Sequence, residues 1–267
     1  MSGGQEREAS LHEIQITIIE QAQNVCRGCR GLGECKQAVR GFIPCYQFDN
    51  GGIYYESMTP CPYMSRWRER SRVSRLLENA HVPKRYSAIG FKDYTISPAN
   101  RQAVILAKAV ADDKNIGAYF YGDAGTGKTM LASVIANTKA LKGMPVVFTS
   151  VPELLTSIRN SFKSGNTDDV TRVYKETPCL ILDDLGAERM TAWVAGELFA
   201  LISHRYNEGL QTVITANYSP QDMVRHLSTY EGYESRQVDD TVGKRIVSRI
   251  AGMCTAVRVG GGDQRMA

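Results

Sequence analysis

The segment Gly122–Thr129, which reads GDAGTGKT, fits the phosphate-loop pattern G-x-x-x-x-G-K-[ST] at every fixed position. The glycines of such a loop allow consecutive backbone N–H groups to turn towards phosphate oxygens, and the N-terminus of the next helix adds partial positive charge. The pattern predicts a nucleotide-binding loop in which Lys128 reaches the β- and γ-phosphates and the Thr129 hydroxyl binds Mg²⁺. The predicted loop consists of Gly122, Asp123, Ala124, Gly125, Thr126, Gly127, Lys128 and Thr129.

The residues on both sides of the loop indicate the strand and the helix that this motif requires. Residues 118–121 form a short apolar run typical of a buried strand, and Leu131, Val134 and Ile135 recur at helical spacing after the loop. The alternation of strands and helices continues along the chain and predicts an α/β fold with a parallel sheet covered on both faces. Further strands are expected at residues 145–149, 179–182 and 212–215, with helices from Leu154 and from Val194 between them.

Two of these predicted strands end in residues suited to phosphate chemistry. A carboxylate at the carboxyl end of a parallel strand faces the same crevice as the phosphate loop. We therefore predict that Asp183 holds Mg²⁺ and that Asp184 orients and polarises the attacking water as a general base. Asn217 follows another strand and could contact the γ-phosphate or the water. The alternative, an aspartate pair that caps the next turn, is disfavoured by the phosphate loop upstream.

Length, charge and composition limit the class of protein. The chain has 267 residues, 43% of them apolar, which suits one large domain or a large domain with a small one. Its net charge of +4 is only mildly basic, so any contact with nucleic acid must come from local clusters of cations. No secretory signal pattern and no apolar run of about 20 residues is visible, so a cytosolic protein without membrane contact is expected.

The cysteines are concentrated at the start of the chain and predict a structural metal site. A module of about 60 residues with few large apolar side chains gains stability from a bound metal. Cys26 and Cys29 form a CxxC step, and Cys61 could close the site from far along the chain. We predict tetrahedral Zn²⁺ with Cys45 as the fourth ligand in preference to Cys35, while an iron–sulfur cluster and free thiols remain alternatives. Cys179 and Cys254 lie in apolar surroundings and are interpreted as inert core residues.

The uneven cysteine distribution suggests two domains joined by a helix. We expect a zinc-binding module over residues 1–65, a linker helix over residues 66–82 and a nucleotide-binding domain over residues 83–267. Five arginines between Arg66 and Arg75 resemble a nucleic-acid stripe, but on a helix they spread around most of the circumference. A solvated connecting helix is therefore favoured over a DNA contact in this segment.

Several motifs in fixed order resemble the AAA+ ATPases of the DnaC/DnaI type, which load bacterial replicative helicases. The motifs are VPKRYS, GDAGTGKT, LILDDLG, VITANYS, RIVSRI and GGDQR, and the resemblance covers about residues 81–267. The Cys-rich segment is similar to the zinc-binding N-terminal domain of the DnaI branch. The resemblance implies that Asn217 is the sensor 1 residue, Arg249 the arginine finger and Arg265 the sensor 2 arginine. It also implies that the strand before Asn217 lies between the strand before the loop and the strand before the acidic pair.

The same resemblance implies a mechanism and partners. The N-terminal module would bind a hexameric replicative helicase, and the ATPase domains would associate side by side with ATP between them. They would hold single-stranded DNA, and hydrolysis would release the loader. The resemblance places the DNA contacts in an inserted helical element. An equally good interpretation is that Phe162 packs in the core and that the other candidate residues lie on the surface without binding DNA. The candidate contacts are Arg159, Phe162, Lys163, Arg172 and Tyr174.

Departures from the family pattern keep other functions open. The family's third zinc ligand is a histidine, and Ile43 stands there in this chain, with Cys45 as a substitute. The acidic pair is Asp-Asp instead of the usual Asp-Glu, which predicts slow hydrolysis. A short N-terminus fits a phage-borne relative. A transposase helper of the IstB type is one alternative, against which the Cys-rich module argues. A zinc-based adaptor that uses ATP as a binding switch with little turnover is another.

Overall fold

A computed structural model describes residues 42–49, 52–60, 64–113, 115–231, 236–238 and 240–263. Contacts divide the chain into two units, Met1–Arg72 and Val73–Ala267. Within the described residues, no helix combines the length and the apolar character needed to cross a membrane.

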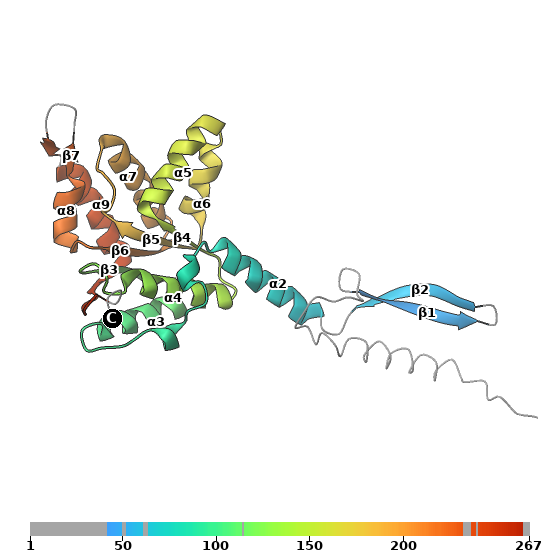
Figure 1. Ribbon diagram of the computed structural model, residues 1–267. Helices are drawn as coiled ribbons and strands as arrows, with labels where there is room; N and C mark the ends of the chain where they lie inside the picture. The colour runs from blue at the N-terminus through green and yellow to red at the C-terminus, as the bar shows by residue number, and fades with distance from the viewer. Residues whose placement is uncertain are drawn as a thin grey trace, which may run out of the picture. The chain divides into compact units, whose positions relative to one another are not determined.

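In the first unit, the described residues form an antiparallel hairpin of β1 (Phe42–Asp49) and β2 (Gly52–Pro60) (Figure 1). Cys45 lies on β1 opposite Ser57, where the register shifts. Cys26, Cys29, Cys35 and Cys61 lie outside the described residues, so the zinc site stays a prediction. The arginine-rich segment is helical as expected, in α2 (Met64–Asn79), and Arg68 and Arg75 are exposed.

The second unit contains a five-stranded parallel sheet in the order β4-β5-β6-β3-β9. The predicted α/β class is confirmed, and β6 lies between β3 and β5 as the resemblance implied. The last strand of the sheet, β9, was not predicted from the sequence. The strands are β3 (Gly117–Tyr121), β4 (Val146–Ser150), β5 (Cys179–Leu185), β6 (Gln211–Ala216) and β9 (Cys254–Arg258).

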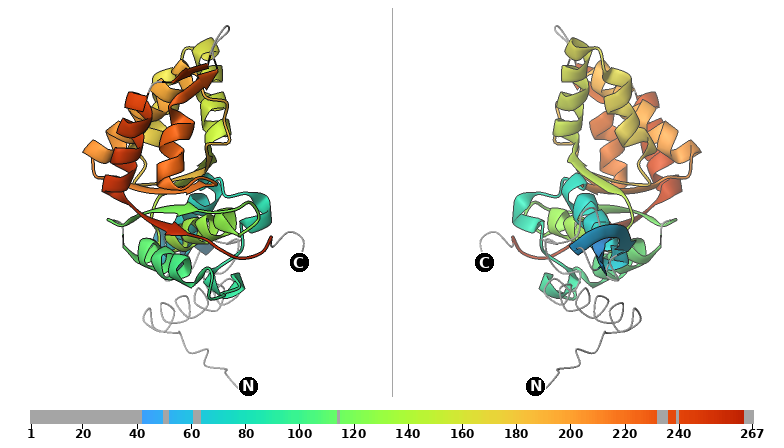
Figure 2. Two further views of the ribbon diagram at one scale, coloured as in Figure 1. Left: turned by 90° about the vertical axis from the view of Figure 1, so that its left-hand side faces the viewer. Right: turned by 90° about the vertical axis from the view of Figure 1, so that its right-hand side faces the viewer.

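Helices cover both faces of this sheet (Figures 1 and 2). One hydrophobic cluster joins the sheet to α3 (Arg101–Asp112) and α4 (Lys128–Leu141). A second cluster on the other face joins it to four helices. These are α5 (Val151–Ser164), α7 (Ala192–Asn207), α8 (Pro220–Leu227) and α9 (Asp240–Met253). The remaining described elements are α6 (Thr167–Glu176), β7 (Thr229–Glu231), β8 (Arg236–Val238), η1 (Lys84–Tyr86) and η2 (Phe91–Asp93).

Local sequence signals set where the helices begin. The Ser150 hydroxyl accepts a hydrogen bond from the Glu153 backbone N–H at 3.3 Å, and the Glu153 carboxylate accepts one from the Ser150 backbone N–H at 3.4 Å. This reciprocal arrangement is a capping box, and it sets the start of α5. At the start of α7, the Thr191 hydroxyl accepts from the Val194 backbone N–H in the same manner, at 3.2 Å.

Helix α7 carries an arginine into the interior. Arg205 is completely buried, although its neighbours Leu198 and Ile202 are the apolar residues that predict the helix. Its Nε donates to the Thr212 hydroxyl at 3.0 Å, and Nη2 donates to a backbone carbonyl at 2.5 Å. Nη1 donates to three more carbonyls, which join α6 and the chain after it to the sheet. Those four carbonyls belong to Gln211 for Nη2 and to Tyr174, Lys175 and Thr177 for Nη1.

The two cysteines of the second unit behave as core residues. Cys179 and Cys254 are free and buried, as the sequence predicts. Burial raises the pKa of the Cys179 thiol to about 11 and that of the Cys254 thiol to about 12. Both therefore stay protonated at neutral pH and are unsuited to nucleophilic or redox chemistry.

Candidate nucleotide-binding site

The phosphate loop lies between β3 and α4, as its motif predicts. Gly125 and Gly127 have φ angles of 79° and 91°, in the left-handed region that glycine adopts at no steric cost. A Cβ at Gly122 would lie 2.5 Å from the Val259 carbonyl oxygen, so the chain after β9 passes directly against the loop. The Thr126 hydroxyl donates to the Asp123 carbonyl at 2.9 Å and closes the turn.

Lys128, the first residue of α4, is almost buried within this loop. Its Nζ donates to the Gly122 carbonyl at 2.9 Å and to the Asp123 carbonyl at 2.7 Å. Phosphate oxygens are stronger acceptors for an ammonium group than carbonyls, because the hydrogen bond is then assisted by charge on both sides. The lysine is thus held at the loop in a position to exchange carbonyl partners for phosphate.

The acidic pair at the end of β5 is split into one buried and one exposed carboxylate. Asp183 is 7% exposed, whereas Asp184 is exposed with a left-handed φ of 62°. The ladder with β6 is interrupted between Leu182 and Leu185, which allows this change of direction. Desolvation raises the pKa of Asp183, and side-chain hydrogen bonds from Thr215 and Thr129 partly oppose that rise.

Thr215 on β6 connects both acidic residues, and sequence reasoning did not single it out. Its hydroxyl donates to Asp183 Oδ1 at 2.5 Å and accepts from the Asp184 backbone N–H at 2.9 Å. The threonine therefore supports the charged form of one carboxylate and the unusual backbone of the other. No sequence signal could have identified it, because the contact depends on the pairing of β5 with β6.

A cavity of about 330 Å³ brings the predicted residues together at the carboxyl ends of the strands. Part of the loop, Asp184 and Asn217 line it, although they come from three separate segments of the chain, whereas the predicted residues Gly122, Asp123, Thr126 and Asp183 are not among its lining residues. Tyr86 of η1 lines it as well, and its carbonyl accepts from Asn137 Nδ2 at 2.8 Å. The sequence did not predict that Tyr86 lines this cavity, although the residue lies in the VPKRYS motif. The lining residues are Tyr86, Ala124, Gly125, Gly127, Lys128, Thr129, Met130, Asp184 and Asn217.

The two arginines predicted near the C-terminus, Arg249 and Arg265, are not among the described residues that line the nucleotide cavity. Arg249 on α9 donates from Nη1 to the Arg245 carbonyl at 3.2 Å and lies 4.9 Å from the Phe199 ring centroid. Among the described side chains, it is not one of those that line its own chain's cavity. Arg265 lies outside the described residues. Asp263 does approach the loop, because a Cβ at Gly125 would lie 2.1 Å from its carboxylate oxygen.

The segment proposed for DNA contact is only partly assembled into one surface. Phe162 is 54% exposed, so the interpretation that it packs in the core is wrong. Its ring meets Trp193 edge to face at 6.4 Å, and the Arg159 guanidinium lies 4.9 Å from the same indole. Lys163 and Arg172 are also exposed, and Arg172 pairs with Asp169 at 2.6 Å, while Tyr174 is half-buried against the core. Trp193 is a member of this surface that the sequence analysis missed.

The oxygen ligands at the loop suit Mg²⁺. Mg²⁺ prefers carboxylate, hydroxyl, water and phosphate oxygens, and Asp183 lies within hydrogen-bonding reach of the Thr129 hydroxyl. Among the side chains that the structure describes, no group of three His, Cys, Asp or Glu residues gathers to hold a metal ion by itself. Asp183 and Thr129 therefore fit a cation that is completed by waters and phosphate.

In the Thr215→Val variant, the loss of the ATP hydrolysis rate on acidification is expected to begin at a higher pH. In the native chain, the hydrogen bond from Thr215 lowers the pKa of Asp183. Without that bond the pKa rises, so the carboxylate protonates at a higher pH. The measurement is the rate of ATP hydrolysis against pH. Thr149→Val on β4 is the control, since that hydroxyl donates to the Ser150 carbonyl and should leave the profile unchanged. An identical profile for Thr215→Val would mean that the Thr215 hydrogen bond to Asp183 does not set the pKa that limits the rate at low pH.

Comparisons with known proteins agree with this geometry. Residues 64–267 match the family model described as "IstB-like ATP binding protein". The replicative helicase loader DnaI of Bacillus subtilis (strain 168) is 28% identical over 97% of this chain and 83% of its own length. A crystal structure of DnaI covers 72% of this chain and 100% of that chain, with 24% identity and a TM-score of 0.58. A crystal structure of the DnaC helicase loader covers 67% and 100%, with 23% identity and a TM-score of 0.57.

Proposed function

Because the chain belongs to the family of IstB-like ATP-binding proteins, we propose that it is an ATP-driven loader of a replicative DNA helicase onto single-stranded DNA. In this proposal, ATP binds at the phosphate loop, the N-terminal module holds a hexameric helicase, and neighbouring copies of the chain associate through their ATP sites. Mg²⁺ accompanies the nucleotide, and Zn²⁺ on Cys26, Cys29, Cys45 and Cys61 maintains the N-terminal module.

The main support for this proposal is the length of the chain over which it is similar to DnaI. The family model begins at residue 64, whereas the similarity to DnaI extends over 97% of the chain and therefore into the residues before it. A protein that shared only the nucleotide domain would not match there. The Cys-rich N-terminal residues are thus treated as part of one functional unit with the ATP site.

The described residues have separate tasks in the proposed hydrolysis. The loop amides and Lys128 orient the triphosphate, and Asp184 takes a proton from the attacking water in the cavity that it lines. Bound Mg²⁺ would neutralise charge on the phosphates, with Asp183 and Thr129 as its protein ligands. Asn217 is assigned to the γ-phosphate or the water.

Arg249 is assigned to the ATP of a neighbouring copy. Its guanidinium is anchored by the Arg245 carbonyl and the Phe199 ring, at a place that does not line its own cavity. An arginine that completes the charge stabilisation from another subunit makes hydrolysis depend on assembly. Arg265 is proposed to contribute within its own chain.

The surface of Arg159, Phe162 and Trp193 is the proposed contact for single-stranded DNA. The exposed Phe162 ring can stack on bases of any sequence, the partly buried Trp193 supports it edge to face, and the guanidinium beside them pairs with the backbone. Lys163 adds a cation next to Phe162 on the same helix. Arg172 and Tyr174 remain secondary candidates, because the former is paired with Asp169 and the latter is half-buried.

The direct test is capture of the helicase. The full chain, immobilised in the presence of ATP, is expected to retain the hexameric replicative helicase of its host. A chain that lacks residues 1–63 should bind ATP equally well and should not retain the helicase. Equal capture by both chains would transfer the docking site to the ATPase domain, and no capture by either would overturn the loader proposal.

A transposase helper is the second candidate, and the family description supports it. In that case the full chain would capture a recombinase and not a helicase. An adaptor with an ATP switch and little turnover is the third, and it is supported by Asp184 at the position where the wider superfamily has glutamate. Binding of ATP without measurable hydrolysis in the presence of single-stranded DNA would favour the adaptor.

A further inference from the structure

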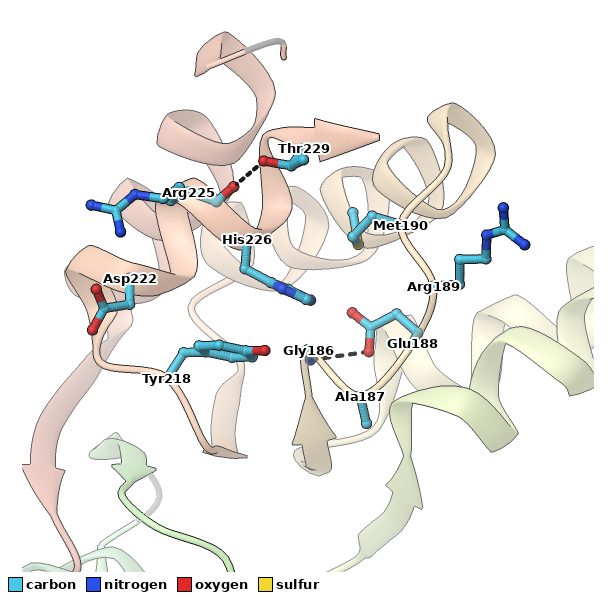
Figure 3. A pocket seen from close by; sticks show the side chains of 10 residues that line it. All are labelled: Gly186, Ala187, Glu188, Arg189, Met190, Tyr218, Asp222, Arg225, His226 and Thr229. Carbon is cyan, nitrogen blue, oxygen red and sulfur yellow. Dashed lines mark hydrogen bonds between the residues drawn. The ribbon is translucent and has the colours of Figure 1, made fainter. Parts of the chain in front are cut away.

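A second and larger cavity lies beside the nucleotide site. It has a volume of about 710 Å³ and lies between the chain that follows β5 and the end of α8 (Figure 3). The connections after β5 and β6 border both cavities, with Asp184 and Asn217 on the nucleotide side and Gly186 and Tyr218 on the other. The lining residues are Gly186, Ala187, Glu188, Arg189, Met190, Tyr218, Asp222, Arg225, His226 and Thr229.

Two buried side-chain atoms in this cavity lack hydrogen-bond partners in the part of the chain that the structure describes. Glu188 is 9% exposed, and its Oε2 accepts from the Gly186 backbone N–H at 3.0 Å, whereas Oε1 has no hydrogen-bond partner. Nε2 of His226 is likewise buried without a partner. Burial lowers the pKa of His226, so the imidazole is neutral near pH 7, and with its proton on Nδ1 its Nε2 is an acceptor. Burial also raises the pKa of Glu188, but hydrogen bonds from backbone N–H groups oppose that rise and favour the carboxylate.

The open atoms of the cavity suit a ligand that donates N–H groups. Figure 3 shows the Glu188 and His226 side chains directed towards each other across the cavity. The Tyr218 ring stacks on the His226 ring with centroids 4.5 Å apart and planes 20° apart. Buried acceptors without donors are costly, so a ligand that supplies donors to Glu188 would bind favourably.

The charges at the rim favour a nucleic acid over a protein cation. Arg189 and Arg225 are exposed and point away from the cavity on opposite sides (Figure 3). The two guanidinium groups outnumber the one exposed carboxylate of the lining, Asp222, so the surface around the cavity attracts a phosphate backbone more than an arginine or lysine side chain. An occupant with a negative backbone and a neutral, N–H-bearing ring meets both conditions.

The cavity is also continuous with the proposed DNA surface along the chain. Met190 lines the cavity, and α7 begins two residues later with Trp193 in its first turn. Trp193 contacts Phe162 and lies beside Arg159. Trp193 follows Glu188 by only five residues, so a single strand bound to that surface lies near the chain that lines the cavity.

We propose that this cavity receives one unpaired base of the bound single strand and prefers bases with an exocyclic amino group. This inference rests on the proposed function, because it requires that the chain bind single-stranded DNA. Cytosine, adenine and guanine present amino donors to the acceptors Glu188 Oε1 and His226 Nε2. Uracil and thymine keep one ring donor, N3–H, but present a carbonyl oxygen in place of the amino group, and the carboxylate repels that oxygen.

The test compares two strands that differ in this group. Fluorescein-labelled oligo(dC) and oligo(dU), each about 12 nucleotides long, are titrated with the full chain in ATP and Mg²⁺ at pH 7.5 and followed by anisotropy. Wild-type chain is expected to bind oligo(dC) about fivefold more tightly than oligo(dU). Glu188→Gln places an amide donor at the open position and should abolish or reverse that preference. Glu208→Gln, an exposed carboxylate after α7, is the matched control and should keep it.

The outcomes separate this inference from the proposed function. Tight binding of both strands with equal affinity would leave the DNA-binding proposal intact and overturn the base preference. Failure to bind either strand would overturn the DNA-binding proposal itself. If Glu188→Gln weakens self-association in sedimentation and leaves the oligo(dC) to oligo(dU) ratio unchanged, the cavity holds a protein side chain and the inference is wrong.

Discussion

Asp184→Asn is expected to lower the rate of ATP hydrolysis by about two to three orders of magnitude while leaving ATP binding nearly unchanged. The asparagine retains the size of the aspartate and tolerates its left-handed φ of 62°, so the connection after β5 should keep its shape. What is lost is the carboxylate that takes the proton from water. Calorimetry measures the binding of ATP, and phosphate release measures the turnover.

A mixing experiment tests whether the site is completed by a second copy. Arg249→Ala is also expected to bind ATP without hydrolysing it, because its guanidinium would be missing from a neighbouring site. Mixed with Asp184→Asn, it should regain part of the activity, since some interfaces then combine an intact Asp184 with an intact Arg249. Unchanged turnover in Asp184→Asn would remove this residue from the mechanism, and a mixture without any recovery would count against a role of Arg249 between subunits.

Arg205→Met is expected to lower the free energy of unfolding by about 3–5 kcal/mol. The methionine keeps an apolar stem of similar length but leaves the Thr212 hydroxyl and four backbone carbonyls without their buried donor. Burial lowers the pKa of Arg205 only to about 10, so the native residue is charged at neutral pH. For a chain of this size the loss corresponds to a fall in the melting temperature on the order of 10 °C.

The control for this change is the same substitution on a neighbouring helix. Arg172→Met removes an exposed ion pair with Asp169, and exposed pairs contribute at most about 1 kcal/mol. Urea unfolding of both variants compares them directly. Similar losses in the two variants would mean that the buried hydrogen bonds of Arg205 are not what stabilises the junction between α6, α7 and β6.

The fold was accessible from local patterns because each signal acts within a few residues. The glycine loop, the Ser150–Glu153 cap and the apolar runs of the four predicted strands each depend on near neighbours in the chain. β9 was missed because Thr255, Ala256 and Arg258 remain exposed at the edge of the sheet, so the strand lacks the continuous buried run of the inner strands. A short edge strand carries little signal of its own.

Much of the candidate site followed from the same reasoning, since parallel strands bring their carboxyl ends to one edge. That rule alone predicts that Asp184 and Asn217 lie near the loop, and both line its cavity. It does not distinguish Asp183 from Asp184, because their different burial arises from the break in the ladder with β6. The exposure of Phe162 could not be predicted either, since its position in the helical pattern fits a core residue and a surface residue equally well.

The amino-acid order therefore specifies the nucleotide loop, the parallel α/β class and the strand ends that carry the acidic residues. Contacts between distant segments specify the rest: Thr215 against Asp183, Trp193 beside Phe162, and Glu188 across from His226. The physical reason is that periodicity and capping depend on neighbours along the chain, whereas a hydrogen bond across a sheet or a buried charge depends on which elements pack together. The positions of Tyr86 at the nucleotide cavity and of Arg205 in the interior also depend on contacts between distant segments.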